Sequence, residues 1–173
     1  MGVEILDAHP ETAMKSALKQ GILSVLQNGA DMTIATVRED GYPQATTVSY
    51  VSDGLTIYFG TAANSQKARN LARSGKVSLT INLPYTNWDD IRGLSMGGIA
   101  KRIEDAAENI RVVRLMFEKF PQIANYVSDP AGGVALFRVM PQVISLLDYR
   151  KGFGHTECVT ARELELSEAI VAA

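Results

Sequence analysis

Three short runs of strand-forming residues, separated by two tight turns, constrain the fold more than any other part of the sequence. Residues 32–60 read MTIATV, REDGYP, QATTVSYV, SDG and LTIYFG. β-branched and aromatic residues are enriched in strands, and Asp-Gly is typical of the tight turn between two antiparallel strands. The segment therefore predicts three consecutive antiparallel strands joined as a meander, the third ending at Gly60.

More strands are predicted further along the chain. KVSLTINL at 76–83 predicts a fourth strand, and IRGLSMGGIAKRI at 91–103 predicts a longer one. Gly97 and Gly98 lie inside this longer strand, where glycines indicate a β-bulge or a surface that another group approaches closely. VALFRVMPQVISLLDYR at 134–150 predicts two strands with Pro141 at the break between them.

Helices are predicted on both sides of the strands. Apolar residues recur at helical spacing over 10–28, with Pro10 in the first turn and Gly29 after the last one. A short helix is expected after Ser65. A third helix is expected before Pro121, with an apolar face made of Ile110, Val113, Met116, Phe117 and Phe120.

Short strands joined mostly by tight turns favour a mainly β fold with flanking helices, in the form of a closed or partly open antiparallel barrel. The 173 residues, 46% of them hydrophobic, are enough for one domain with a real core. We expect a single domain over 1–173, with an N-terminal helix at 10–28, a barrel core at about 31–150 and a C-terminal extension at 151–173.

Composition excludes several classes of function. The formal net charge of −2 gives no general attraction for nucleic acid. One cysteine and two histidines make a metal cluster or a histidine-based triad unexpected, so we predict no metal site. The N-terminus lacks a signal-peptide pattern, and no apolar run is long enough to span a bilayer. We therefore expect a soluble, cytoplasmic protein that does not act at a membrane.

The stretch GTAANSQKARNLARSGK, residues 60–76, places polar side chains where a strand gives way to a helix. If Ser65 is the N-cap, the backbone N–H groups of the next three residues are free donors at the positive end of the helix dipole. Lys67 in the first turn is unfavourable for a bare helix, which prefers an acid there. A bound phosphate would remove the conflict. The alternative is that Ser65 only caps the helix and Lys67 points to solvent.

The segments IATVREDGYPQATTVSYV, IYFGTAANSQKARNL, KVSLTI, GGIAKRI and VMPQVISLLDY resemble the pyridoxamine 5′-phosphate oxidase-like FMN-binding split barrels. The similarity covers about residues 31–149. It implies an antiparallel split β-barrel of the FMN-binding type, and a homodimer with FMN at the subunit interface. By position, it implies that the cofactor contacts Thr46, Thr47, Val48, Ser49, Gly60, Thr61, Ser65, Gln66 and Lys67.

The sequence departs from the family's true oxidases at three places. Thr46 stands where they have an arginine for the FMN phosphate, and Val51 stands where they have a lysine for the substrate phosphate. Their late Arg-x-His motif is absent. The resemblance is therefore closer to the general flavin-binding and stress-protein branch than to a pyridoxamine phosphate oxidase. The family also includes proteins that bind deazaflavin F420 or haem.

A second resemblance concerns KGFGHT, which is similar to a C-terminal segment of haem-binding and haem-degrading split barrels. It makes His155 a candidate axial ligand of haem iron, the alternative being a glycine-rich loop with an exposed histidine. Trp88 is expected to anchor its loop to the core rather than to line the cofactor pocket.

The resulting expectation is an FMN-dependent oxidoreductase acting on a small molecule, with no side chain assigned as catalytic. The alternatives are a flavin-binding or flavin-sensing protein without turnover, and a haem-binding or haem-degrading protein.

Overall fold

The computed structural model describes residues 10–125 and 133–165. The helices are α1 (Pro10–Asn28), α2 (Gln66–Arg73) and α3 (Ala106–Lys119), and the short 3-10 turns are η1 (Trp88–Asp90), η2 (Pro121–Asn125) and η3 (Tyr149–Lys151). The strands are β1 (Asp31–Val37), β2 (Pro43–Asp53), β3 (Thr56–Ala62), β4 (Lys76–Asn82), β5 (Arg92–Arg102), β6 (Val134–Asp148) and β7 (Thr156–Thr160). A helical turn at 161–165 follows, and the rest of the predicted C-terminal extension, 166–173, lies outside the described residues. None of the described helices combines the length and the apolarity needed to cross a membrane.

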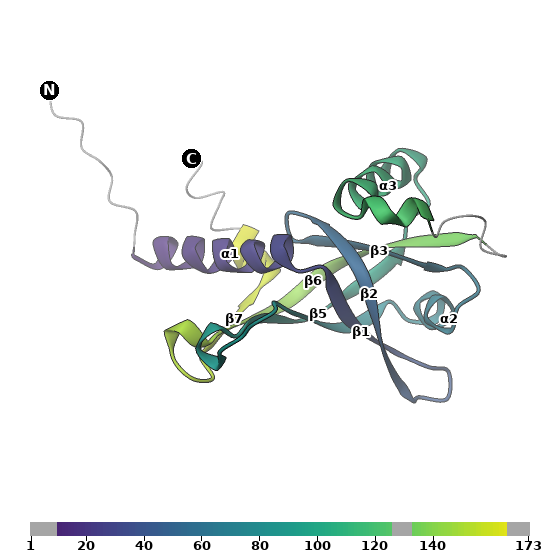
Figure 1. Ribbon diagram of the computed structural model, residues 1–173. Helices are drawn as coiled ribbons and strands as arrows, with labels where there is room; N and C mark the ends of the chain where they lie inside the picture. The colour runs from purple at the N-terminus through teal and green to yellow at the C-terminus, as the bar shows by residue number, and fades with distance from the viewer. Residues whose placement is uncertain (1–9, 126–132, 166–173) are drawn as a thin grey trace, which may run out of the picture.

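Six strands close into an antiparallel barrel, whose arrangement can be followed in Figure 1. The sheet order is β3-β2-β1-β4-β5-β6-β7, and β3 also pairs with β6, which joins the first six strands into a ring. The length of β6 allows this, because residues 134–139 pair with β3 while residues 143–147 pair with β7. The predicted fold, mainly β with flanking helices around an antiparallel split barrel, is confirmed.

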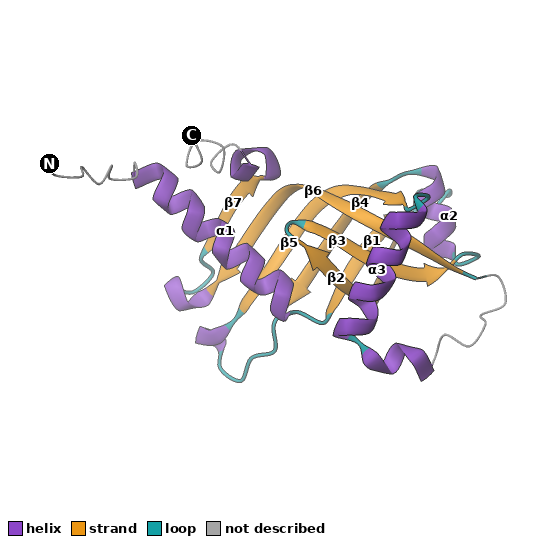
Figure 2. Ribbon diagram, turned by 90° about the horizontal axis from the view of Figure 1, so that it is seen from above, coloured by secondary structure: helices purple, strands orange, loops and turns teal. Residues whose placement is uncertain are grey.

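The barrel core follows from the alternation of side chains along the strands. In β1, every second residue is buried, which places Met32, Ile34 and Thr36 inside. α1 covers the core with Leu18, Ile22, Val25 and Leu26, each of which contributes about 1.5–3 kcal/mol on burial. Figure 2 shows α1 and α3 lying across the strands, and α2 at the end of the molecule away from β7.

Two predictions about strand boundaries are wrong. β3 continues past Gly60 to Ala62, because β6 offers it a pairing partner there. β6 is one strand rather than two, and it passes through Pro141 at a β-bulge. Gly97 pairs with Val143 and Gly98 with Pro141, so the ladder is already interrupted where proline has no N–H to donate. The predicted bulge in the glycine segment is thus confirmed.

The predicted apolar face of α3 is wrong in part. Val112, Met116 and Phe120 are buried, whereas Ile110 is 72% exposed, and Val113 and Phe117 are about 40% exposed (38% and 39%). Polar contacts of two arginines fix the rotation of the helix. Arg111 pairs with Asp53 and donates to Tyr58 Oη at 2.7 Å, and Arg138 pairs with Glu108 at 2.7 Å. The result is a helix with an apolar stripe on its surface.

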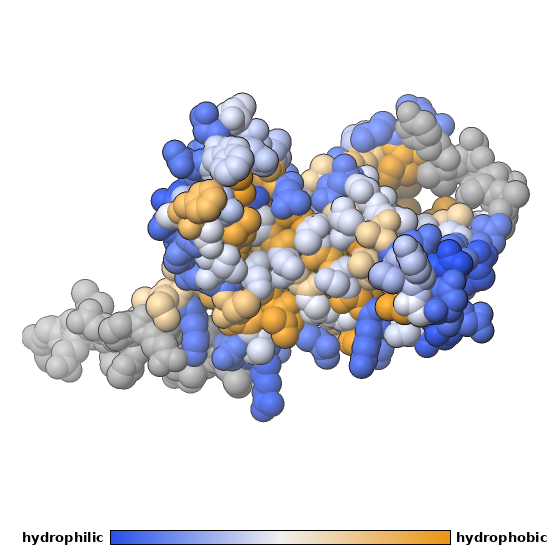
Figure 3. Space-filling model, turned by 90° about the horizontal axis from the view of Figure 1, so that it is seen from below, coloured by the Kyte–Doolittle hydropathy of each residue, from blue (hydrophilic) through white to orange (hydrophobic). Residues whose placement is uncertain are grey.

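Trp88 does not anchor its loop to the core. It is 66% exposed and stacks on Phe153, with 6.1 Å between ring centroids and 12° between planes, and Phe153 is itself 80% exposed. The two loops that carry these rings therefore hold each other. Figure 3 shows that apolar residues also gather across the middle of the face seen from below. The protein thus exposes apolar surface in more than one place.

Candidate cofactor site at a split in the barrel wall

The barrel wall opens where β2 and β3 diverge. Four residue pairs join these strands, from Tyr50↔Phe59 to Asp53↔Thr56. Residues 43–49 of β2 pair only with β1, and residues 60–62 of β3 pair only with β6. α2 follows β3 in the chain and packs on β1, β3 and β5, and its Asn70 donates to Gln44 of β2 (Figure 1). Since alternate residues of a strand direct N–H and C=O away from the paired neighbour, both edges offer backbone groups to this split.

All nine residues predicted to contact the cofactor border the split. Thr46, Thr47, Val48 and Ser49 come from the β2 edge, Gly60 and Thr61 from the β3 edge, and Ser65, Gln66 and Lys67 from the start of α2. Residues up to 21 positions apart in sequence therefore meet in one region.

Lys67 is a buried cation without a counter-charge. Its side chain belongs to the first turn of α2, and the residue is 7% exposed. Its Nζ lies 5.8 Å from the centroid of the Phe59 ring, and it makes no hydrogen bond or ion pair with any described residue. Burial lowers its pKa below the ordinary lysine value. Burying an unpaired ammonium is costly, so the site favours an anion beside it.

Thr46 supplies a second unsatisfied group. Its Oγ1 is buried and has no hydrogen-bond partner in the described part of the chain. Thr46 lies two residues from Gln44 on the same face of β2, and Gln44 accepts a hydrogen bond from Asn70 at 3.2 Å. Asn70 follows Lys67 by three residues on the same face of α2. Thr46 and Lys67 therefore lie on facing surfaces of β2 and α2.

Asn70 was not predicted from the sequence. It is 2% exposed and also donates to Thr36 Oγ1 at 2.9 Å, which fixes α2 over the barrel. The sequence offers no signal for this role, because an asparagine in a short helix is usually exposed.

The hydroxyl and amide side chains at the start of α2 are already engaged. Ser65 is the N-cap, as predicted; its Oγ accepts from the N–H of Ala68 at 3.2 Å and lies 3.1 Å from Thr61 Oγ1. Gln66 donates to Asn70 Oδ1 at 2.8 Å and accepts from Arg69 at 2.8 Å. The N–H of Ala68 is thus not free, contrary to the sequence prediction. Lys67 and the N–H groups of residues 66 and 67 remain available for an anion.

An apolar groove of about 470 Å³ adjoins the split on its outer side. Val48, Ser49, Gly60 and Thr61 form one wall. The other wall, which the sequence did not reveal, comes from Asn109, Val113, Met116 and Phe117 of α3, together with Val134 and Leu136. A Cβ on Gly60 would lie 3.2 Å from both Val134 and Leu136, so glycine keeps the groove open. The volume is within the usual range for a cofactor-sized ligand.

Two predicted residues direct their hydroxyls toward β1 on the outer surface. Thr47 Oγ1 lies 3.4 Å from Thr33 Oγ1, and Ser49 donates to Asp31 at 2.7 Å. These residues can offer a ligand their backbone groups, while their side chains hold the β1–β2 pair.

His155 lies away from the split, between η3 and β7. Its Nε2 is buried and lies 3.2 Å from Glu157 Oε2. Hydrogen bonding to Lys151 is the main cause that lowers the pKa of the Glu157 carboxyl. His155 lines neither the groove of about 470 Å³ at the split nor the cavity of about 710 Å³ between α2 and β5. In this arrangement, Nε2 is turned toward a carboxylate and not toward a ligand cavity.

Solved structures with the same fold include three bacterial proteins. A haem-binding protein from Mycobacterium smegmatis has a TM-score of 0.70 and 20% identity over 91% of this chain; the chain spans 61% of that protein's length. ChuZ from Campylobacter jejuni has a TM-score of 0.71 and 11% identity, covering 88% of this chain and 64% of its own. The haem storage protein HutZ from Vibrio cholerae has a TM-score of 0.60 and 23% identity, and the match covers 72% of this chain and 89% of HutZ.

No protein of curated function matches this sequence. The sequence model of the pyridoxamine 5′-phosphate oxidase family, in contrast, matches residues 18–148, which include α1 from Leu18 and every barrel strand. The chain belongs to the pyridoxamine 5′-phosphate oxidase family.

Proposed function

We propose that the chain binds FMN at the split between β2 and β3, with the phosphate beside Lys67 and the ring along the adjoining groove. The observation that carries this proposal is the buried, unpaired Lys67 ammonium, on the α2 face that contacts β2 through Asn70 and Gln44, together with the unsatisfied hydroxyl of Thr46 on that strand. A phosphate supplies the negative charge and the acceptor atoms that both groups lack. The N–H groups at the start of α2 add donors at the positive end of the helix dipole.

The groove suits the flat part of the cofactor. Its walls are mainly apolar, Gly60 leaves room over β3, and the edge of β2 offers backbone donors and acceptors to ring nitrogens and oxygens. The same features would accept a deazaflavin, which carries a phosphate in the equivalent position.

The proposed activity is an oxidoreduction of a small molecule. When bound, FMN supplies the hydride or electron transfer. The chain's own residues bind the phosphate through Lys67, orient the ring through the β2 edge, and exclude water with Val113 and Phe117 of α3. We assign no side chain as an acid, base or nucleophile. A flavin-binding protein without turnover would use the same residues.

We further propose that the protein is a homodimer in which a second copy covers the groove. Ile110, Val113 and Phe117 form an exposed apolar stripe on α3, at the open side of the groove. Contiguous apolar surface of this kind is typical of interaction sites. A two-fold dimer would bury the stripe and shield the cofactor ring from water at the same time. A monomer in sedimentation that still holds FMN at one per chain would contradict this proposal.

Haem binding is the second candidate, because two of the structural neighbours are described as haem-binding and haem storage proteins. It requires an axial ligand. His155 could serve only if its Nε2 were released from Glu157.

The proposal is tested by titrating the protein with FMN, riboflavin and haemin. Riboflavin lacks the phosphate, so FMN should bind at least tenfold more tightly to the wild type, and Lys67→Ala should remove most of that difference. Lys76→Ala, which removes an exposed lysine outside the split, is the control. Equal affinities for FMN and riboflavin in the wild type would contradict the phosphate site. A haem absorption band with no flavin retained would favour the second candidate.

A further inference from the structure

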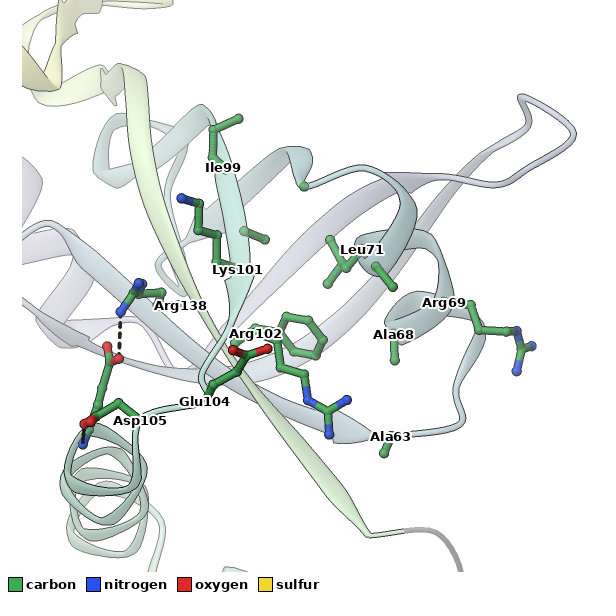
Figure 4. Close-up of a pocket in the computed structure, with 15 residues that line it drawn as sticks. Ala63, Ala68, Arg69, Leu71, Ile99, Lys101, Arg102, Glu104, Asp105 and Arg138 are labelled. Atoms are coloured by element: carbon green, nitrogen blue, oxygen red, sulfur yellow. Dashed lines mark hydrogen bonds and ion pairs between the residues drawn. The ribbon is translucent and has the colours of Figure 1, made fainter.

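A second and larger cavity, of about 710 Å³, lies behind α2. It is bounded by α2, the end of β5, the loop that leads to α3, and β6 (Figure 4). Ala68, Leu71 and Ala72 form its α2 wall, and Ile99 and Phe137 continue the apolar lining. α2 thus borders two regions. Lys67 and Asn70 face the split, whereas Ala68 and Leu71, which follow them in the sequence, line this cavity.

The close approach of Gly75 to Ala100 fixes one wall of the cavity. The N–H of Ala100 donates to Gly75 O at 2.7 Å, and a Cβ on Gly75 would lie 2.5 Å from Ala100 O. The chain just after α2 is therefore held close to β5, which sets the spacing between α2 and β5 on this side of the cavity.

Most charged groups around this cavity already have partners. Glu108 pairs with Arg138 at 2.7 Å, and Asp105 accepts from the N–H of Glu108 at 2.7 Å as the N-cap of α3. Arg69 donates to Asn64 O at 2.5 Å and to Gln66 at 2.8 Å, and it points away from the other cations in Figure 4.

Lys101 and Arg102 are different, because neither makes a hydrogen bond or an ion pair with any described residue. As neighbours on a strand, they point to opposite sides of it. Figure 4 shows the Arg102 side chain extending toward Ala63, which precedes α2, whereas Lys101 is directed to the opposite side of β5, away from α2. Glu104 also has no partner in the described part of the chain and lies beside Arg102.

We propose that this cavity is a second ligand site, for an organic anion that joins a flat apolar body to a phosphate, sulfonate or carboxylate group. The alanine, leucine and phenylalanine side chains would bury the body, since apolar contact provides most of the affinity in sites of this size. The Arg102 guanidinium would bind the anionic group in a bidentate manner, with Lys101 adding charge at the rim. Glu104 would oppose the anion. The proposal does not depend on flavin binding, because Lys67 takes no part in it.

Anilinonaphthalene sulfonate, which has this chemistry, is a suitable probe. Its fluorescence is titrated with the folded full-length protein, with and without saturating FMN, so that binding in the groove is recognised by its loss when FMN is added. The double variant Lys101→Gln/Arg102→Gln should bind the probe about tenfold more weakly. Arg114→Gln/Arg162→Gln removes the same charge from exposed positions outside the cavity and should bind like the wild type.

Two further variants separate a specific site from general charge attraction. Glu104→Gln should tighten probe binding by about three- to tenfold, because it removes a carboxylate that would repel the anionic probe and that has no partner among the described residues. Ala72→Phe should block binding by filling the apolar wall, while far-ultraviolet circular dichroism confirms that it is folded. Lys67→Ala should leave probe binding unchanged, even if it abolishes FMN binding. Equal affinities of the two double variants, or weaker binding by Glu104→Gln, would overturn the proposal.

Discussion

Replacing Lys67 by methionine should change the stability of the ligand-free protein and its affinity for FMN in opposite directions. Methionine keeps much of the lysine side-chain length and removes the charge. In the ligand-free protein, Lys67 is 7% exposed and has no hydrogen-bond or ion-pair partner among the described residues. Removing an unpaired buried polar group of this kind should raise the free energy of unfolding by about 1–2 kcal/mol.

The expected loss of FMN affinity follows from the hydrogen bond that Lys67 would donate to the phosphate. A hydrogen bond between charged groups contributes about 1.5–3 kcal/mol, so Lys67→Met should weaken FMN binding roughly 10- to 150-fold. Riboflavin binding should stay nearly unchanged because it has no phosphate. Urea unfolding without ligand measures the first effect, and flavin fluorescence titration measures the second.

Lys119→Met provides the matched control. Burial lowers the pKa of Lys119 too, despite an opposing contribution from Asp31. Unlike Lys67, however, Lys119 donates to Gly29 O at 2.6 Å and lies 4.3 Å from the centroid of the Tyr50 ring. Lys119→Met should therefore destabilise the protein and leave FMN affinity intact. If Lys67→Met behaved in the same way, the assignment of Lys67 to the phosphate would be refuted.

Alkaline pH gives an independent check on Lys67. Its pKa is lower in the folded protein than in the unfolded chain, so the unfolded chain binds more protons between the two values. Stability of the ligand-free protein should therefore rise with pH across this range, below the ordinary lysine pKa. FMN affinity should fall over the same range as the ammonium loses its proton. Both trends should be absent in Lys67→Met.

Three further substitutions test other parts of the site and fold. Thr46→Val removes a buried hydroxyl that has no partner among the described residues. The free energy of unfolding should stay unchanged or rise slightly, and FMN affinity should fall about three- to tenfold. A large loss of stability would contradict the reasoning. Gly60→Val places a branched side chain against Leu136, 3.2 Å from the new Cβ; FMN and riboflavin should weaken equally, whereas an effect on FMN alone would argue against a ring in the groove. Asp148→Asn removes a buried carboxylate that accepts from Arg150 at 2.6 and 2.8 Å, at a cost of about 1–3 kcal/mol at neutral pH. Hydrogen bonding to Arg150 lowers the pKa of Asp148. The wild type should therefore lose its stability advantage over Asp148→Asn as pH falls below about 4. A stability difference that persists in acid would contradict the pairing of Asp148 with Arg150.

The β1–β2–β3 meander was predictable because its signals are local. Gly41 and Gly54 have φ angles of 82° and 56°, which few residues other than glycine adopt, and each lies in a turn between two strands. The start of α2 was predictable for the same reason, since Ser65 caps it through a contact three residues away.

What the sequence did not show depends on contacts between distant segments. The pairing of β3 with β6 closes the barrel and extends β3 to Ala62. The rotation of α3 depends on contacts of Arg111 with Asp53 and Tyr58, which lie 58 and 53 positions earlier in the chain. For this reason, the α3 wall of the groove was invisible in the sequence, although the nine residues of the split were identified by resemblance.

The most direct test of the flavin site is a crystal structure of the protein grown with FMN. We predict electron density for the flavin at the split between β2 and β3, with a phosphate oxygen at hydrogen-bond distance, roughly 3 Å, from Lys67 Nζ. Flavin found only in the cavity behind α2, or a split that stays closed to ligand while FMN binds elsewhere, would contradict it.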